Sequence, residues 1–194
     1  MHEYLSLSLT LFLVIDALGN LPTFLYLLKP IEKKKQKRIV LRELGFSLLI
    51  MALFHYVGRM LLETLNISQN TTQIAGGIIL FLIAIRLIFS QEEEKMKWGE
   101  KEPFVVPIAT PLVAGPSVFA VVTISSQKPT DDLLVLGAIL TSWFLSCLVF
   151  IFGGYIYKGM KEKGLLACQR LMGLIVAMIS VQVFLEGLQG ILGS

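Results

Sequence analysis

The chain contains the apolar run Ile78-Ile79-Leu80-Phe81-Leu82-Ile83-Ala84-Ile85, in which no side chain is polar. Strands of a transmembrane barrel alternate apolar and polar residues, and this run does not. It lies within a longer apolar segment, residues 73–90. That length approaches the roughly 20 residues that a helix needs to cross about 30 Å of hydrocarbon. The run therefore predicts a transmembrane helix, because lipid offers no partners to an open strand.

Five further segments of the 194-residue chain have the same character. The sequence is 55% hydrophobic and 16% charged, with a mean hydropathy of +0.73. Soluble domains are about 45–50% apolar and about 25% charged, so this composition excludes a soluble globular domain. We expect an all-α membrane protein with six transmembrane helices, over residues 5–28, 44–62, 73–90, 104–126, 133–157 and 171–190.

The charged residues lie almost entirely between these segments, in short connectors and at the N-terminal tip. The exceptions are Asp16, Arg59, Arg86 and Glu186. The last three are near segment ends, where a long side chain reaches the interface, so Asp16 alone is central. Because the connectors are short, we expect one integral membrane domain over residues 1–194.

Lysine and arginine are concentrated in alternate connectors, which sets the orientation in the membrane. The fourteen on one side are Lys29, Lys33, Lys34, Lys35, Lys37, Arg38, Arg42, Lys95, Lys97, Lys101, Lys158, Lys161, Lys163 and Arg170. The other side has Lys128, with Arg59 nearby. We expect the basic connectors to lie in the cytoplasm and both termini to lie outside it. The first segment lacks the basic start and cleavage site of a signal peptide, so we expect it to be retained.

Metal, nucleotide and nucleic-acid chemistry have no support in the sequence. Cys147 and Cys168 are expected at different levels in a reducing environment, so a disulfide is not expected. Neither cysteine makes a metal-ligand spacing with His2 or His55, and the sequence contains no phosphate-binding glycine-lysine loop. The basic run after the first segment is explained by topology and by contact with anionic lipid. We therefore expect no metal, no cofactor and no nucleic-acid partner.

Three glycines of the first half fall into register with three of the second half. The pairs are Gly19 with Gly115, Gly58 with Gly154 and Gly76 with Gly173, at offsets of 96, 96 and 97. Many transporter folds consist of such internal repeats. Each half holds three helices, an odd number, so the second half must be inverted in the membrane. We expect two inverted repeats, residues 1–90 and 104–194, joined by a cytoplasmic linker over residues 91–103.

The first and fourth segments are the ones most interrupted by helix-breaking residues. They read Asp16-Ala-Leu-Gly-Asn-Leu-Pro-Thr23 and Pro107-Ile-Ala-Thr-Pro-Leu-Val-Ala-Gly-Pro-Ser117. Proline removes a helical hydrogen bond and glycine eases opening of the chain. Interrupted helices at matching positions of two halves point to a transporter's binding site at the membrane midplane. Ordinary kinks or points of close packing are the alternative.

We expect a binding site between these two broken helices. Asp16 shares a helix face with Gly19 and Asn20 and suits a substrate ammonium group or a coupling proton. A structural buried carboxylate is the alternative for Asp16. Helix N-termini after Gly19 and Gly115 suit a carboxylate. The candidate binding residues are Asp16, Gly19, Asn20, Pro22, Thr23, Gly76, Gly77, Thr110, Pro111, Gly115, Pro116, Ser117 and Gln182.

Three of these candidates have an equally simple structural interpretation. Gly76 and Gly77 permit close helix packing. Gln182 suits a hydrogen bond to a neighbouring helix as well as it suits the lining of a cavity.

Four stretches of the chain resemble the MarC family, and the resemblance covers essentially the whole sequence. They are Asp16-Ala-Leu-Gly-Asn-Leu-Pro22, Ile74-Ala-Gly-Gly-Ile-Ile-Leu80, Val106-Pro-Ile-Ala-Thr-Pro-Leu-Val-Ala-Gly-Pro-Ser117 and Arg170-Leu-Met-Gly-Leu-Ile175. Ser117 stands where glycine is common in the family. The resemblance implies a bacterial or archaeal inner-membrane protein, grouped with six-helix neutral amino-acid transporters and related to LysE-type exporters. A small neutral amino acid is the partner that it implies, beside membrane lipid.

We therefore expect transport by alternating access and no enzymatic activity. One alternative is an intramembrane hydrolase with Ser117 as nucleophile and His55 as base, although Pro116 and the absence of a following glycine argue against a nucleophile elbow. An aspartyl protease needs two carboxylates, and only Asp16 is central. A structural or regulatory membrane protein is the other alternative. The substrate, direction, coupling ion and any homo-oligomer are left open.

Overall fold

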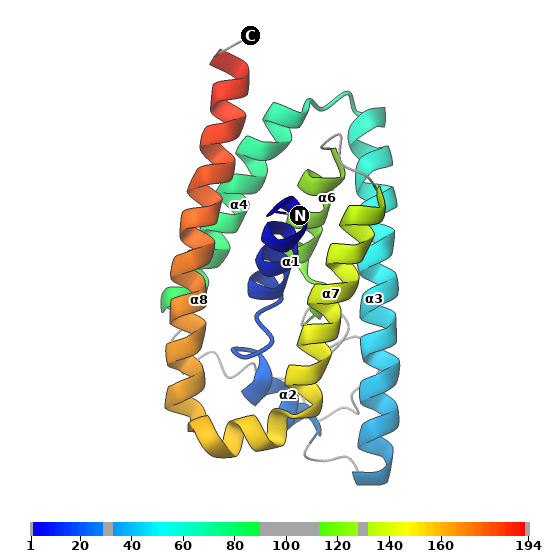
Figure 1. The fold of residues 1–194 in the computed structure, drawn as a ribbon, viewed down its shortest axis with the longest axis vertical. Coiled ribbons are helices and arrows are strands. Elements are labelled where there is room, and N and C mark those ends of the chain that lie inside the picture. Colours follow the sequence, from blue (N-terminus) through cyan, green and yellow to red (C-terminus); the bar gives the residue numbers. More distant parts are fainter. Residues whose placement is uncertain (1, 29–32, 90–112, 128–131, 193–194) are drawn as a thin grey trace.

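The computed structural model describes residues 2–28, 33–89, 113–127 and 132–192 (Figure 1). These ranges contain seven helices and no strand. The helices are α1 (His2–Ile15), α2 (Leu21–Leu28), α3 (Lys33–Thr64), α4 (Gln69–Phe89), α6 (Pro116–Gln127), α7 (Asp132–Ile151) and α8 (Gly153–Leu192). The described part of the chain is therefore all-helical, as the sequence predicts.

Four of the described helices are long and apolar enough to cross a membrane, namely α3 from Arg38 onward, α4, α7 and α8. The expected first segment, residues 5–28, is interrupted between α1 and α2. Of the expected fourth segment, residues 104–112 lie outside the described residues. Ala114 and Gly115 are not helical, and α6 begins directly after them. The protein is a multi-pass helical membrane protein.

Large apolar side chains cover the outside of these helices. Leu53 on α3, Leu82 on α4, Leu140 on α7 and Leu174 on α8 are each at least half exposed. An apolar surface of this extent belongs in contact with lipid.

The interior contains serines among its apolar side chains. The hydroxyl groups of Ser47, Ser142, Ser146 and Ser180 are buried, and each donates to a carbonyl group three or four residues earlier in its own helix. Such bonds satisfy the hydroxyl group without a partner on another helix. The core is therefore close-packed without leaving these groups unpaired.

The lower end of the molecule in Figure 1 differs from the sequence expectation. The expected fifth segment, residues 133–157, ends at Ile151, and the expected connector over residues 158–170 is helical within α8. The first part of α8 runs across the lower end before the helix turns upward at Lys161, which has φ 54° and ψ −179°. Ile156 and Tyr157 pack against the core here while the lysines are exposed. An amphipathic helix lying across the end explains the difference.

Helices α4 and α8 are antiparallel and form the most extensive helix contact. Glycines allow this close approach. A Cβ atom on Gly77 would lie 2.8 Å from the backbone nitrogen of Phe184, and one on Gly173 would lie 2.9 Å from the Cβ of Leu87. Small residues at helix contacts are typical of membrane proteins, because they let backbones approach.

The remaining helices pack in matched pairs. Helix α1 packs mainly against α7 and α3 mainly against α6, while α1 also contacts α6 and α3 contacts α7. In Figure 1, α1, α4 and α7 run downward, whereas α3, α6 and α8 run upward. Helices from the two halves of the chain therefore pack against one another in a single bundle.

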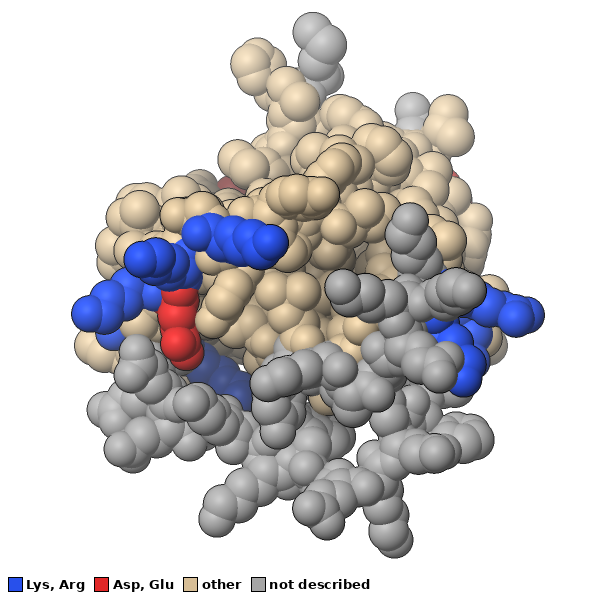
Figure 2. All heavy atoms as spheres, turned by 90° about the horizontal axis from the view of Figure 1, so that it is seen from below, with Lys and Arg blue, Asp and Glu red and all other residues tan. Residues whose placement is uncertain are grey.

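Basic side chains gather at the lower end, on two sides of the surface in Figure 2. The exposed ones are Lys35, Arg38 and Arg42 at the start of α3 and Lys158, Lys161, Lys163 and Arg170 of α8. The connectors that are rich in lysine and arginine in the sequence thus lie together at the lower end of the molecule.

Substitution of Gly77 tests the tightness of the α4–α8 contact. Gly77→Ala is expected to lower the free energy of unfolding by about 1–3 kcal/mol, because the new methyl group meets backbone that cannot rotate away. Gly45→Ala is the control, because a Cβ atom there has no described atom within 4 Å. It is expected to be neutral or to stabilise α3 by up to about 1 kcal/mol. Melting temperatures in detergent measure both, and equal effects would contradict the glycine contact.

Candidate functional site

The interruption of the first segment begins at Asp16. Its φ of 49° lies in the left-handed region, which aspartate and asparagine tolerate better than most residues. A single turn follows, closed by the N–H of Asn20, which donates to the carbonyl oxygen of Asp16 at 2.9 Å. Helix α2 then starts, with the N–H of Phe24 donating to the carbonyl oxygen of Asn20 at 2.9 Å. The chain thus changes direction at Asp16 and resumes as a helix at Leu21.

Two polar side chains satisfy backbone groups that this turn leaves open. The N–H of Gly19 donates to Oδ1 of Asp16 at 3.1 Å. Nδ2 of Asn20 donates to the carbonyl oxygen of Ile15 at 3.1 Å. The first bond caps the turn from its N-terminal side, and the second occupies a carbonyl group at the end of α1. Both side chains therefore help to hold the break.

The Asp16 carboxylate is buried, with the residue 3% exposed. Its neighbours Ile15 and Ala17 are buried as well. No ion pair of Asp16 is present among the described residues, and the hydrogen bond seen there comes from the neutral N–H of Gly19. A buried carboxylate is costly without a positive partner or a proton. The turn therefore carries an acidic group that a cationic group or a proton would compensate.

Gln169 of α8 lies against the same turn. A Cβ atom on Gly19 would overlap the Asp16 carboxylate and lie 2.7 Å from Cδ of Gln169, so only glycine fits without displacement. Sequence analysis missed Gln169, because it falls in the expected connector over residues 158–170. No local signal identifies it, since its contact with Gly19 depends on the path of α8.

The turn lies toward the basic end of the molecule. Gln169 precedes Gly173 by one helical turn, and Gly173 packs against Leu87 and Ile88 in the last turn of α4. Gly19 is therefore on the side of the Gly173 contact that is closer to the basic start of α8.

The second interruption precedes α6. Val113, Ala114 and Gly115 are buried, and Pro116 and Ser117 form the first turn of the helix. Proline suits this position, since its missing N–H has no helical partner there. Helix α6 contacts α1, and residues of both interruptions belong to one hydrophobic core. No hydrogen bond joins Asp16 to Ser117 within the described ranges.

The other predicted site residues divide into three groups. Pro22 and Thr23 are half-buried in the first turn of α2. Gly76 packs against Ile124 of α6, and Gly77 packs against α8, so both lie at helix contacts. Thr110 and Pro111 lie outside the described residues.

Gln182 is separate from the two interruptions. It is exposed on the outside of α8, and its Nε2 donates to Oε1 of Glu186 at 3.1 Å. The structure therefore brings Asp16, Gly19 and Asn20 together and leaves Gln182 on another surface.

A second polar cluster joins three helices at the upper end. His55 of α3 is 1% exposed. Its Nδ1 lies 2.6 Å from Oγ of Ser126 on α6, and its Nε2 lies 3.5 Å from Oδ1 of Asp132 on α7. Arg59 donates to the same Asp132 oxygen at 3.1 Å. Because Ser126 donates its proton to the carbonyl oxygen of Val122, its oxygen accepts the Nδ1–H of His55.

Glu43 is a further buried acid that sequence analysis missed. It is 2% exposed, and its Oε1 accepts two hydrogen bonds from Arg42. Its Oε2 has no hydrogen-bond partner in the described part of the chain. The sequence expectation began the helix at residue 44 and counted Glu43 with the connector charges. The spacing of Glu43, Ser47, Met51 and His55 by four residues could have revealed it, since all four are buried on one face of α3.

Comparison with known proteins gives the family. The family described as "MarC family integral membrane protein" matches residues 1–192. The chain belongs to the MarC family. The resemblance noted in the sequence is thereby confirmed over almost all of this MarC protein.

Relatives of this MarC protein are of nearly the same length. It is 40% identical over 193 residues to the UPF0056 inner membrane protein YhgN of Escherichia coli K12, covering 97% of this chain and 98% of the relative. It is 42% identical over 194 residues to a UPF0056 membrane protein of Buchnera aphidicola subsp. Baizongia pistaciae, again covering 97% and 98%. A UPF0056 membrane protein of Chlamydia pneumoniae is 32% identical over 187 residues, covering 95% and 93%. No solved structure matches.

Substitutions at Asp16 test how the MarC protein holds its helix break. Asp16→Ala is expected to lower the free energy of unfolding by about 1–3 kcal/mol, because alanine loses the cap on Gly19 and is strained at a positive φ. Asp16→Asn is expected to leave stability nearly unchanged, since asparagine tolerates this conformation and accepts the same N–H. Thermal melting in detergent compares the two, and equal melting temperatures would exclude the capping role.

Proposed function

We propose that this MarC family protein is an inner-membrane transporter of small neutral amino acids and that the turn at Asp16 forms part of its binding site. The observation that carries the proposal is the buried Asp16 carboxylate at an opened helix, without an ion pair in the described ranges. A zwitterionic substrate brings an ammonium group that would compensate this charge as water is removed.

The groups around the turn suit the rest of such a substrate. Gln169 lies against Gly19 and offers a neutral carboxamide. The start of α6, at Pro116 and Ser117, offers the partial positive charge of a helix N-terminus to a substrate carboxylate. The interior around them is apolar, which suits a small neutral side chain.

We propose further that the chain consists of two inverted three-helix repeats. The first repeat contains α1, α3 and α4, and the second contains α6, α7 and α8. Exchange of α1 with α6, α3 with α7 and α4 with α8 maps the α1–α7 contact onto α3–α6 and the α4–α6 contact onto α1–α8. The members of each pair run in opposite directions in Figure 1, as inversion requires. Gly76 and Gly173 are both buried at helix contacts. Gly58 packs against Thr123, whereas Gly154 has no such contact, because it lies in the first part of α8, which runs across the lower end.

In this scheme the cluster of His55, Ser126 and Asp132 holds the upper end closed. It joins α3 of the first repeat to α6 and α7 of the second. Alternating access requires such contacts between repeats to break when the site opens to that side. The Asp16 turn lies nearer the opposite, basic end, so the arrangement would correspond to a state closed at the upper end.

The hydrolase alternative is not favoured by the position of His55. Its Nδ1 is hydrogen-bonded to Ser126 and its Nε2 faces Asp132, so neither ring nitrogen is placed to act as a base for the Ser117 hydroxyl group. Ser126 is itself buried, and its proton is committed to Val122. A serine nucleophile needs both a base and access for substrate.

Transport is tested with purified protein in liposomes, using labelled neutral amino acids with and without a proton gradient. Uptake above that of empty liposomes is expected. If Asp16 meets the ammonium group, Asp16→Asn should weaken substrate binding by roughly 2–5 kcal/mol. If Asp16 carries the coupling proton, counterflow should persist while gradient-driven accumulation is lost.

The control variant is Glu63→Gln, at an acid that is 65% exposed on α3. It should behave like the unchanged protein. Uptake equal to that of empty liposomes for every neutral amino acid would reject this substrate class. Normal affinity together with normal accumulation in Asp16→Asn would reject the role of Asp16.

We also propose that the basic end faces the cytoplasm, which cysteine labelling tests in a variant lacking Cys147 and Cys168. Cysteines at Lys35 and Lys163, both exposed at the basic end, should be shielded from an impermeant thiol reagent in intact bacterial cells. A cysteine at Leu65, exposed between α3 and α4 at the upper end, should be labelled. Permeabilised cells should label all three. The reverse labelling pattern in intact cells would show that the basic end faces away from the cytoplasm.

A further inference from the structure

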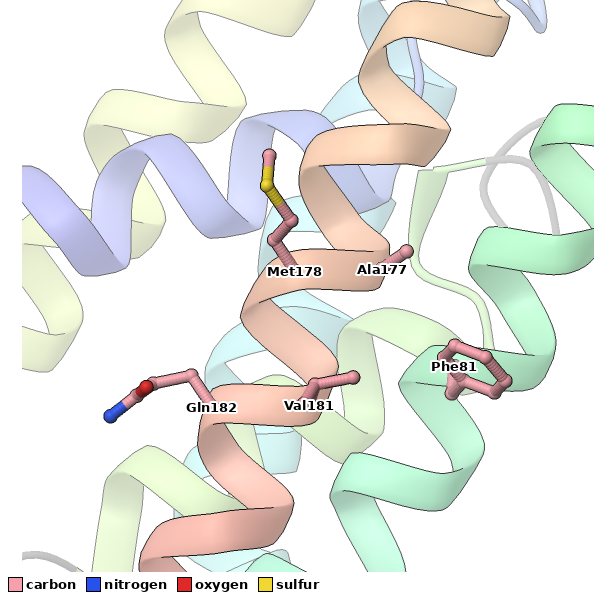
Figure 3. A pocket seen from close by; sticks show the side chains of 5 residues that line it. All are labelled: Phe81, Ala177, Met178, Val181 and Gln182. Atoms are coloured by element: carbon pink, nitrogen blue, oxygen red, sulfur yellow. The ribbon is translucent and has the colours of Figure 1, made fainter.

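Gln182 lies on the outside of the bundle near the middle of its membrane-crossing helices. It lines a shallow pocket of about 350 Å³ together with Phe81, Ala177, Met178 and Val181 (Figure 3). Phe81 is close to the centre of α4, which runs from Gln69 to Phe89. Gln182 is therefore far from both ends of α4, where water and headgroups would meet a polar side chain.

The Gln182 side chain points away from α4. In Figure 3, Ala177 and Val181 project toward Phe81, whereas Met178 and Gln182 project to the other side of α8. The carboxamide of Gln182 donates one hydrogen bond, to Glu186 of the same helix. Its oxygen and its second N–H have no partner within the described ranges. Polar side chains at this depth almost always face a protein interior, because lipid tails offer them no hydrogen bonds.

The exposed face that contains Gln182 has the periodicity of a helix–helix seam. Its residues alternate in steps of four and three along α8, and every one of them is exposed. They are Leu171, Ile175, Met178, Gln182, Leu185, Gln189 and Leu192. A repeat of 3.5 residues keeps one stripe of side chains facing a partner helix over several turns. We call this stripe the α8 seam.

We propose that two copies of this chain associate in the membrane through the α8 seam. A two-fold axis along the membrane normal would place the two α8 helices parallel and bring the same residues face to face. A carboxamide is both donor and acceptor, so Gln182 of one copy can pair with Gln182 of the other. The seam is thus complementary to itself, which favours a second copy over a different protein. The inference does not depend on what the protein transports.

Cysteine cross-linking in membranes tests the seam, in a variant with Cys147 and Cys168 replaced by alanine. Met178→Cys leaves Gln182 in place and is expected to form a disulfide-linked dimer when an oxidant is added. Leu140→Cys is the matched control, because Leu140 is 51% exposed near the centre of α7 and lies away from the seam. Adding Gln182→Leu to Met178→Cys is expected to weaken association about fivefold, the effect of losing roughly 1 kcal/mol of interhelical hydrogen bonding.

Single-molecule photobleaching in dilute liposomes provides a second measurement. Two-step bleaching for the unchanged seam, with a larger fraction of single steps for Gln182→Leu, supports the proposal. Cross-linking of Leu140→Cys as efficient as that of Met178→Cys would mean random collision and would overturn it. So would a cross-link to a protein of different mass, or single-step bleaching of the unchanged chain.

Discussion

Every backbone group released between Ile15 and Leu21 must find a hydrogen-bond partner inside the protein, because lipid supplies none. Asp16 and Asn20 meet this requirement with two short bonds in opposite directions along the chain. The capping carboxylate then occupies the space beside Gly19, where a Cβ atom would overlap it. The local solution to the break thus leaves a buried acid beside Gly19, against which Gln169 packs.

Elsewhere in the described interior most buried hydroxyl groups are satisfied in a simpler way, although Oγ1 of Thr123 has no hydrogen-bond partner there. Buried serines donate to carbonyl groups of their own helices, and close packing at glycines supports helix contacts such as α4 with α8. Two carboxylates stand apart from this pattern among the described residues. Asp16 is bonded to a neutral N–H, and Glu43 has one oxygen without a hydrogen bond. Buried charge is therefore concentrated at a few positions in the described interior.

Local features of the sequence predicted the helical membrane architecture, the family and the point at which the first segment is interrupted. Apolar length, the glycine and proline cluster and the position of Asp16 are all properties of neighbouring residues. The contact of Gln169 with Gly19 and the pairing of His55 with Ser126 could not be read in this way, because each joins helices far apart in the chain. The expected end of the fifth segment was wrong for a related reason. Apolar residues 152–157 continue the hydrophobic pattern, but in the structure they belong to a turn and a helix lying across the end.

The short first helix has a consequence for biogenesis. Residues 5–28 form a predominantly apolar stretch that contains Asp16 and is synthesised before the helices that later surround it. Gln169, which completes the surroundings of the turn, is synthesised only when most of the chain has left the ribosome. The hydrogen bonds that hold the turn at Asp16 are local, whereas its packing against Gln169 is completed only when α8 arrives. A chain that ends before α8 would therefore lack Gln169 beside this turn.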